Sequence, residues 1–218
     1  MPVTILDERL RFPPPALANE EGLLAVGGDL SAPRLLLAYR SGIFPWSADP
    51  LTWWSPDPRA IFEPGDFHVS HSLEKVNRQG RFRVTRNRAF RQVIAGCAAS
   101  APGRRSTWIC TKFLEAYIRL HEQGHAHSVE CWQGSQLAGG IYGVALGGLF
   151  AGESMFHRAS NASKVALFHL CRHLQERNFA LFDIQMLTPI TTQLGGKTIP
   201  RSAYLRRLGR AVEQPCVF

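Results

Sequence analysis

The sequence lacks a hydrophobic run long enough to cross a membrane. Every apolar stretch is shorter than the roughly 20 residues that span a bilayer. The first nine residues, Met-Pro-Val-Thr-Ile-Leu-Asp-Glu-Arg, lack the basic segment and apolar core of a signal peptide. No membrane partner is predicted from this pattern, and a cytoplasmic location is expected.

Cysteine and histidine patterns typical of metal sites are also missing. The five cysteines are scattered, odd in number and without a C-x-x-C motif, so neither disulfides nor a zinc site is indicated. His125 and His127 lie two residues apart on one face of a predicted strand and could bind a metal. No third ligand stands at a recognised spacing, which favours a structural role, and no metal is expected.

Acidic residues are few. The 218 residues include 17 Asp and Glu against 25 Lys and Arg, which gives a net charge of +8. A chain that is 45% hydrophobic and 19% charged predicts one globular domain or two small ones. Excess positive charge is typical of nucleic-acid binding, although solubility alone would also explain it.

A glycine-rich stretch, residues 139–164, is the most informative part of the chain. Gly147-Gly148 predicts a two-residue hairpin turn between apolar strands at residues 138–146 and 149–151. Glu153 is expected at the end of the second strand, beside Met155, where a carboxylate would suit a cationic partner. An ordinary solvated glutamate at a hairpin end is the alternative.

The N-terminal third predicts a small α/β unit followed by an aromatic segment. A strand is expected at residues 23–26, and a helix is expected to begin after Ser31. Prolines interrupt the segment from Phe44 to Arg59, which predicts irregular structure there. Its tryptophans indicate either a flat ligand surface or a small satellite core, and a domain boundary is expected near residue 60.

Two basic regions are candidates for phosphate contacts. Residues 68–91 carry Lys75, Arg78 and Arg83 among other cations, and a predicted loop before residue 110 carries Arg104 and Arg105 beside a tryptophan. Such side chains can hold phosphates without reading sequence. A solvated cationic face is the alternative.

Further along, an apolar strand is predicted at residues 179–185. Regular alternation would place Asp183 and Gln185 on one face. A carboxylate aimed into a sheet is costly unless it is paired or functional, so this pair is a candidate for catalysis.

Taken together, these segments resemble the leucyl/phenylalanyl-tRNA–protein transferase family. The matching segments span nearly the whole chain in the family's order: residues 22–30, 42–46, 53–59, 121–130, 139–145, 152–156, 161–164 and 183–185. The resemblance implies an α+β protein, with a small N-terminal α/β domain at residues 1–60. A larger catalytic domain, similar to the GCN5-related acetyltransferases, would occupy residues 61–218.

The resemblance also implies an activity and its partners. Leu or Phe, and Met less well, would pass from aminoacyl-tRNA to the N-terminal Arg or Lys of a protein, marking it for degradation by the N-degron pathway. The family uses no metal or organic cofactor, and a monomer is expected. The reaction needs no covalent intermediate, because an aminoacyl ester is activated and an α-amine of pKa roughly 7.7–8.0 is partly neutral.

Residue roles follow from the same resemblance. Gln185 would contact the attacking amine, Asp183 would polarise or orient it, and Glu153 would lie in the acceptor site. The residues that would bind the donor are Trp46 and Trp108 on the terminal adenosine, and Ile141, Phe150 and Met155 around the transferred side chain.

Three positions depart from the family's pattern. Ile190 stands where a histidine is expected, His157 where a small hydroxyl residue is expected, and Ile141 where methionine is also familiar.

Two rival functions remain open. An acetyl-coenzyme A-dependent acetyltransferase would need a pyrophosphate loop that residues 136–141 match incompletely. A non-catalytic RNA-binding module would explain the charge and the tryptophans but not the polar trio Glu153, Asp183 and Gln185.

Overall fold

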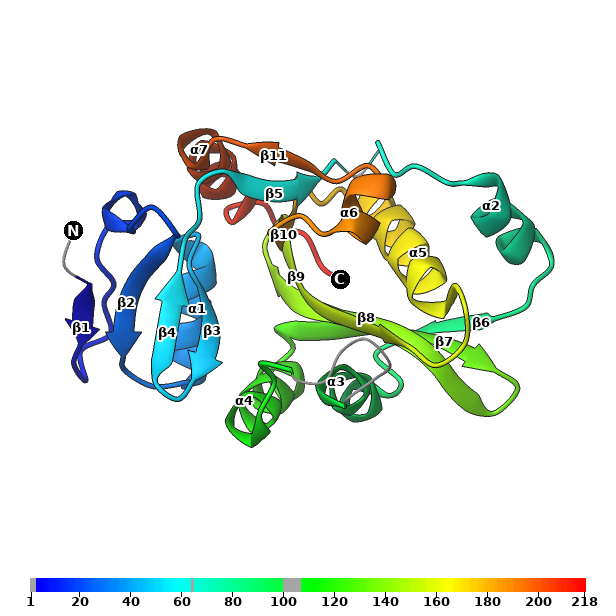
Figure 1. The fold of residues 1–218 in the computed structure, drawn as a ribbon, viewed down its shortest axis with the longest axis horizontal. Helices are drawn as coiled ribbons and strands as arrows, with labels where there is room; N and C mark the ends of the chain where they lie inside the picture. The colour runs from blue at the N-terminus through cyan, green and yellow to red at the C-terminus, as the bar shows by residue number, and fades with distance from the viewer. Residues whose placement is uncertain (1–2, 64, 100–106) are drawn as a thin grey trace.

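The computed structural model describes residues 3–63, 65–99 and 107–218 and contains two β-sheets (Figure 1). The smaller sheet has the strand order β1-β2-β4-β3. Helix α1 (Ala32–Arg40) lies beside it, and a short 3-10 turn, η1, covers Pro15–Leu17. The strands of the smaller sheet are β1 (Thr4–Leu6), β2 (Leu23–Gly27), β3 (Phe44–Ala48) and β4 (Leu51–Trp54).

The larger sheet has seven strands in the order β11-β5-β10-β9-β8-β7-β6. These are β5 (Arg59–Phe62), β6 (Arg83–Arg86), β7 (Ala126–Gln133), β8 (Gln136–Leu146), β9 (Leu149–His157), β10 (Leu181–Gln185) and β11 (Lys197–Ile199). The remaining helices are α2 (His71–Arg78), α3 (Phe90–Ala98), α4 (Thr111–Glu122), α5 (Ala162–Glu176), α6 (Pro189–Gln193) and α7 (Arg201–Ala211). Helices α3 and α4 cover one face of the sheet and α5 covers the other (Figure 1).

The predicted mixed α+β architecture is therefore confirmed, with a smaller N-terminal and a larger C-terminal part. The first sheet uses strands from residues 4–54, and the second sheet takes its first strand from residue 59 onward. The division into two domains near residue 60 stays a prediction. None of the described helices has the length and apolar character needed to cross a bilayer.

The predicted hairpin is present as β8 and β9, joined at Gly147 and Gly148. Gly147 has a φ of 54°, and a Cβ there would lie 2.5 Å from the carbonyl oxygen of Val212. Both the left-handed backbone and the close approach of the C-terminal segment therefore require glycine.

The prediction of irregular structure around the tryptophans is wrong. β3 and β4 pair as an antiparallel hairpin with a bulge between Pro45 and Ser47. β3 is the edge strand, where a residue without an N–H costs the ladder little. Trp53 is fully buried and donates its indole N–H to the carbonyl of Gly27 at 2.9 Å, so this side chain is a core residue.

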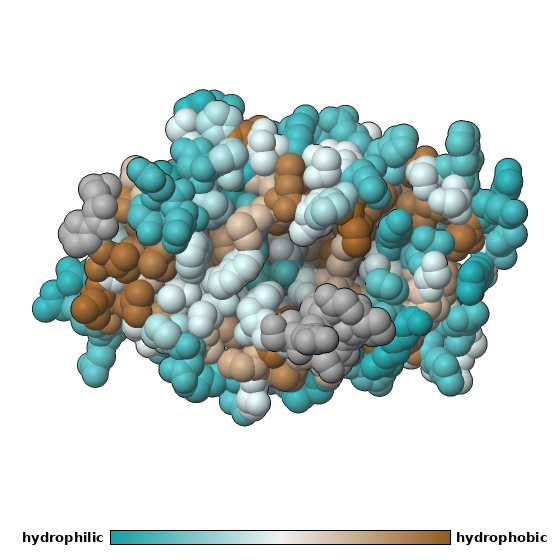
Figure 2. All heavy atoms as spheres, viewed as in Figure 1, coloured by the Kyte–Doolittle hydropathy of each residue, from teal (hydrophilic) through white to brown (hydrophobic). Residues whose placement is uncertain are grey.

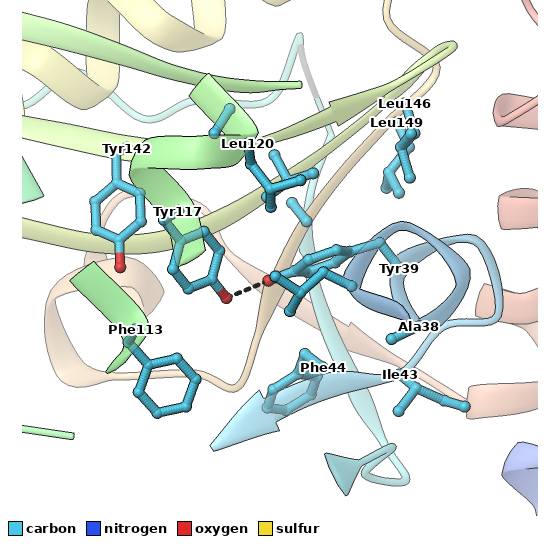
Figure 3. Packing of buried hydrophobic residues seen from close by; sticks show 14 of the residues in the cluster. Ala38, Tyr39, Ile43, Phe44, Phe113, Tyr117, Leu120, Tyr142, Leu146 and Leu149 are labelled. Atoms are coloured by element: carbon cyan, nitrogen blue, oxygen red, sulfur yellow. Dashed lines mark hydrogen bonds between the residues drawn. The ribbon is translucent and has the colours of Figure 1, made fainter. Parts of the chain in front are cut away.

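One hydrophobic core joins the two sheets. Figure 3 shows Tyr39 of α1 meeting Tyr117 of α4, with Tyr142 of β8 nearby and the two tyrosine hydroxyls hydrogen-bonded. All three side chains are at most 2% exposed. The N-terminal part therefore packs directly on the larger sheet next to the polar residues described below.

Candidate active site

The site forms where two parallel strands separate. β9 and β10 pair only over residues 149–151 and 181–183. Beyond that point β9 stays with β8, while the chain after β10 turns toward α6 (Figure 1). The side chains of Glu153 and Gln185 lie just past the point of separation.

Glu153 is the extra residue of a β-bulge. The register of β8 and β9 moves from the pair Gly143–Gly152 to the pair Tyr142–Ser154 and leaves Glu153 without an opposite residue. The prediction that Glu153 ends its strand is therefore wrong, because β9 continues to residue 157. Bulges re-aim single side chains within a sheet, and they are over-represented next to active sites.

Gln185 is also held in an irregular position. The pairing of β10 with β5 shifts between Asp183 and Gln185, and Gln185 has a φ of 63°. This left-handed conformation is uncommon for a residue other than glycine and often marks functional sites. The Asp183 carboxylate accepts the backbone N–H of Gln185 at 2.9 Å, so the predicted regular alternation is replaced by a turn that Asp183 stabilises.

The Glu153 carboxylate is held from both sides. Gln185 Nε2 donates to its Oε1 at 2.8 Å, and the Tyr117 hydroxyl donates to its Oε2 at 2.9 Å. Burial raises the pKa of Glu153 to about 7, although hydrogen bonds from Tyr39 and Tyr117 act in the opposite direction. Glu153 is therefore protonated more easily than an ordinary glutamate, and carboxylates perturbed in this way cluster at functional sites.

Asp183 has a buried cation as its partner. Arg59 donates from Nε and Nη2 to the two carboxylate oxygens at 2.8 and 2.7 Å, and the Tyr204 hydroxyl donates to Oδ2 at 2.8 Å. The guanidinium lies between the rings of Phe44 and Tyr204, 4.7 and 4.6 Å from their centroids. Arg59 also donates to the carbonyl of Gly42 at 3.1 Å, which ties the N-terminal part to the site.

Sequence reasoning missed four members of this network, Tyr39, Arg59, Tyr117 and Tyr204. Only Arg59 had a usable signal. It directly precedes the apolar run Ala60-Ile-Phe62, and a charge at the start of a buried strand needs a partner such as a buried aspartate.

Of the three residues predicted to line the pocket for the transferred side chain, the structure brings Ile141 and Met155 together but not Phe150. Ile141 and Met155 lie opposite each other on β8 and β9 and belong to the core on the α5 side. Phe150 is 1% exposed and packs against Phe182 and Phe218, at ring distances of 5.6 and 5.4 Å. Phe150 therefore lies inside the core, away from an open surface.

The two predicted adenosine contacts come from different parts of the fold. Trp46 lies on the edge strand β3, is 37% exposed, and has Trp54 at a ring distance of 6.3 Å. Trp108 precedes α4 and packs edge-on against Phe113 at 5.0 Å. Trp46 thus has the accessible face that stacking requires, while Trp108 is half-buried.

Of the predicted phosphate contacts, Lys75 and Arg78 are exposed on α2, and Arg83 is exposed on β6. Figure 1 places α2 and β6 at the end of the molecule opposite the first sheet. Arg104 and Arg105 lie outside the described residues.

The predicted histidine pair has polar and aromatic neighbours. His127 Nδ1 lies 3.1 Å from the amide nitrogen of Asn87, and its ring stacks on Phe218; burial lowers the pKa of His127 to about 4. In the parts of the chain that the structure describes, no group of three or more His, Cys, Asp and Glu is arranged to hold a metal ion.

Two of the three departures from the expected pattern are exposed side chains. His157 ends β9 and is exposed, and Ile190 is the second residue of α6 and is 39% exposed. Neither side chain belongs to the hydrogen-bonded network around Glu153.

The geometry defines a class of enzyme. A carboxylate and an amide, those of Glu153 and Gln185, meet where two strands separate. This suits direct transfer of an activated acyl group to an amine. Sequence comparison gives the family: the profile described as "Leucyl/phenylalanyl-tRNA protein transferase" matches residues 61–209, and the profile of its N-terminal domain matches residues 28–57. The chain belongs to this family, and it is an aminoacyltransferase.

Individual relatives agree. A leucyl/phenylalanyl-tRNA–protein transferase from Anaeromyxobacter sp. (strain Fw109-5) is 50% identical over 218 residues, covering 99% of this chain and 93% of the relative. The protein of the same name from Shewanella pealeana is 52% identical over 201 residues, covering 90% and 85%.

Solved structures are more distant. A GCN5-related N-acetyltransferase from Kribbella flavida matches with a TM-score of 0.44 and 12% identity, over 75% of this chain and 59% of that chain. A GCN5-related N-acetyltransferase-like protein from Streptococcus suis gives 0.37 and 15%, over 65% and 57%. This chain spans less than two thirds of each.

A tryptophan substitution tests the donor end of the site. Stacking of a base on an aromatic ring contributes roughly 1–3 kcal/mol, so Trp46→Ala should weaken the apparent affinity for aminoacyl-tRNA about 5- to 150-fold. Trp108→Ala should do the same if its indole also packs on the adenosine. Donor KM is the measurement, and thermal unfolding is the control. A variant that unfolds, or one that keeps its donor KM, has a structural tryptophan.

Proposed function

We propose that this protein transfers Leu or Phe, and Met less readily, from aminoacyl-tRNA to the N-terminal Arg or Lys of proteins. The observation that carries the proposal is the half-buried Glu153 carboxylate, held by Gln185 and Tyr117 where β9 and β10 separate. A carboxylate in such a place pairs with a guanidinium or ammonium group and selects against neutral side chains. The products would enter the N-degron pathway, and the charged tRNA donor suits a cytoplasmic reaction.

The chemistry is aminolysis of an ester. The α-amine of the acceptor attacks the ester carbonyl, the bond to the ribose oxygen breaks, and the amine gives up a proton as the ribose hydroxyl is restored. Because Gln185 Nε2 donates to Glu153, its amide oxygen is oriented to accept a hydrogen bond from the amine. Such an acceptor and correct orientation can supply much of the rate.

Asp183 acts through Gln185 in this scheme. Its oxygens are engaged by Arg59, Tyr204 and the backbone N–H of Gln185. Asp183 is therefore a positioning residue that holds Gln185 in its left-handed conformation, and the amine meets Gln185 itself.

The donor would contact both parts of the protein. We propose residues 1–60 as a separate N-terminal domain that supplies Trp46 to the adenosine and Tyr39 to the Glu153 network. Ile141 and Met155 would line the side-chain pocket, where a flexible methionine tolerates Leu, Phe and Met. Lys75, Arg78 and Arg83 would hold tRNA phosphates.

An acetyltransferase that uses acetyl-coenzyme A is the second candidate, and the fold argues against it. Its pyrophosphate loop would have to lead from a strand into a helix N-terminus. Residues 136–141, which match that loop incompletely, lie entirely within strand β8. A merely RNA-binding protein would have no use for the network that joins Glu153, Gln185 and Asp183.

The proposed function is tested by incubating the protein with Phe-tRNA and a peptide that begins with Arg, and by reading the product by mass spectrometry. A charge-assisted hydrogen bond is worth about 1.5–3 kcal/mol, so Arg- and Lys-starting peptides should exceed an Ala-starting peptide by at least about tenfold in kcat/KM. Glu153→Gln keeps the size and removes the charge. It should abolish most of this preference while leaving donor KM nearly unchanged.

The pH profile gives this experiment a control. The wild-type preference for Arg over Ala should grow as the pH rises through about 7, because Glu153 ionises there. Deprotonation of the acceptor α-amine affects the Arg-starting and the Ala-starting peptide equally. It therefore cancels in the ratio of their kcat/KM values. Glu153→Gln should show a flat ratio. If the variant kept the full preference for Arg, Glu153 would be a structural residue.

A further inference from the structure

In the part of the chain that the structure describes, strand β9 has no strand neighbour on one side beyond residue 151. Beyond residue 151 it no longer pairs with β10, whereas it stays paired with β8 as far as residue 157. Residues 152–155 are partly exposed, although Gly143, Tyr142 and Ile141 opposite them are buried. The side of β9 that faces away from β8 therefore carries no paired strand from residue 152 to residue 157 among the described residues, and Glu153 lies at the start of this unpaired edge.

The hydrogen bonds to β8 show which backbone groups point outward. Arg158 N–H donates to the carbonyl of Ala138 at 2.7 Å, so the pair His157–Gly139 exchanges no hydrogen bonds of its own. In an antiparallel ladder hydrogen-bonded and non-hydrogen-bonded pairs alternate. Ser154 and Phe156 therefore point their N–H and C=O toward β8, and those of Met155 point toward the unpaired edge.

We propose that the first residues of the acceptor polypeptide add to this edge as a short strand parallel to β9. The inference rests on the proposed function, which places residue 1 of the acceptor at Glu153. From there the chain can leave along the direction of β9, past Met155. In a parallel ladder this register puts residue 3 opposite Met155, whose N–H donates to the carbonyl of residue 2 and whose C=O accepts the N–H of residue 4.

Backbone pairing fits the chemistry of this acceptor. Glu153 selects the first side chain by charge, and an added strand gives affinity through main-chain hydrogen bonds without reading the later side chains. The segment that leaves β10 offers unselective apolar contact as well. Met186, Leu187 and Ile190 are 42%, 37% and 39% exposed, and Figure 2 shows hydrophobic atoms at the surface over α6 and the segment before it.

The test uses acceptor peptides of sequence Arg-Ala-Ala-Ala-Ala-Tyr that carry a single N-methyl group at residue 3, 4 or 5. Methylation at residue 4 removes the predicted donor to Met155 and places a methyl group in the ladder. It should lower kcat/KM with Phe-tRNA by about tenfold, the upper end of the range for one lost hydrogen bond, because the methyl group also blocks close approach of the two strands. Methylation at residue 3 or 5 should cost less than about threefold, because those amides point away from β9.

The three peptides control for one another, because each carries the same methyl group and the same charge. Equal losses at residues 3, 4 and 5, or no loss at residue 4, would overturn the strand-addition proposal. The unmethylated peptide keeps the two proposals distinguishable: absence of transfer to it refutes the proposed function itself. A folded reporter protein with Pro at residue 4 should likewise be a poorer acceptor than one with Pro at residue 3.

Discussion

Replacing Arg59 with methionine should lower the free energy of unfolding by about 3–5 kcal/mol, because the Asp183 carboxylate would stay buried without its cation. Both side chains are 1% exposed. Burial lowers the pKa of Arg59, but the charges and hydrogen bonds around it, with Asp183 first among them, together outweigh burial and raise that pKa above its ordinary value. The guanidinium therefore keeps its charge. Urea unfolding followed by fluorescence measures the loss.

An exposed ion pair provides the matched control. Arg172 and Glu176 lie one turn apart on α5 and are 59% and 60% exposed. Arg172→Met should change the free energy of unfolding by no more than about 0.5 kcal/mol. Combining Arg59→Met with Asp183→Leu should recover part of the loss, because no unpaired charge remains. If Arg59→Met alone lowered the free energy of unfolding by less than about 1 kcal/mol, the buried Arg59–Asp183 pair would not stabilise the site as proposed.

The hairpin could be predicted because its signals are local. Gly147 and Gly148 fit a two-residue turn, and the apolar residues on each side continue far enough to make strands. The helix predicted after Ser31 is also present as α1. In both cases the residues that determine the element are neighbours in the sequence.

The site geometry could not be predicted, because it depends on residues far apart in the sequence. The separation of β9 from β10 and the bulge at Glu153 arise from pairing between strands, and no local pattern marks them. Arg59 lies 124 positions before Asp183. The hydroxyls of Tyr39 and Tyr117, which meet beside Glu153, come from residues 78 positions apart.

The error at the tryptophan segment has a related cause. Pro45 argues against a central strand but is compatible with an edge strand, and the position of β3 at the edge follows only from the order of the whole sheet. Proline content therefore indicated the wrong local structure, although the segment does present Trp46 at the surface.

Gln185→Ala should lower kcat by about 10²-fold or more at saturating peptide, the usual effect of losing a positioned group that acts on a proton in the transition state. The substitution leaves the Asp183 interaction with the backbone N–H in place, and alanine, like glutamine, is a residue with a Cβ, so the strain at a φ of 63° is similar.

Stability should therefore change little in Gln185→Ala, in contrast to Arg59→Met. Asp183→Asn should lower both kcat and stability, because it weakens the Arg59 pair and the hold on Gln185 together. Single-turnover rates with Phe-tRNA and an Arg-starting peptide, measured beside urea unfolding, separate the two patterns. A Gln185→Ala protein that kept kcat within about threefold of wild type would remove Gln185 from contact with the amine. The positioning role of Asp183 would then have no group to act through.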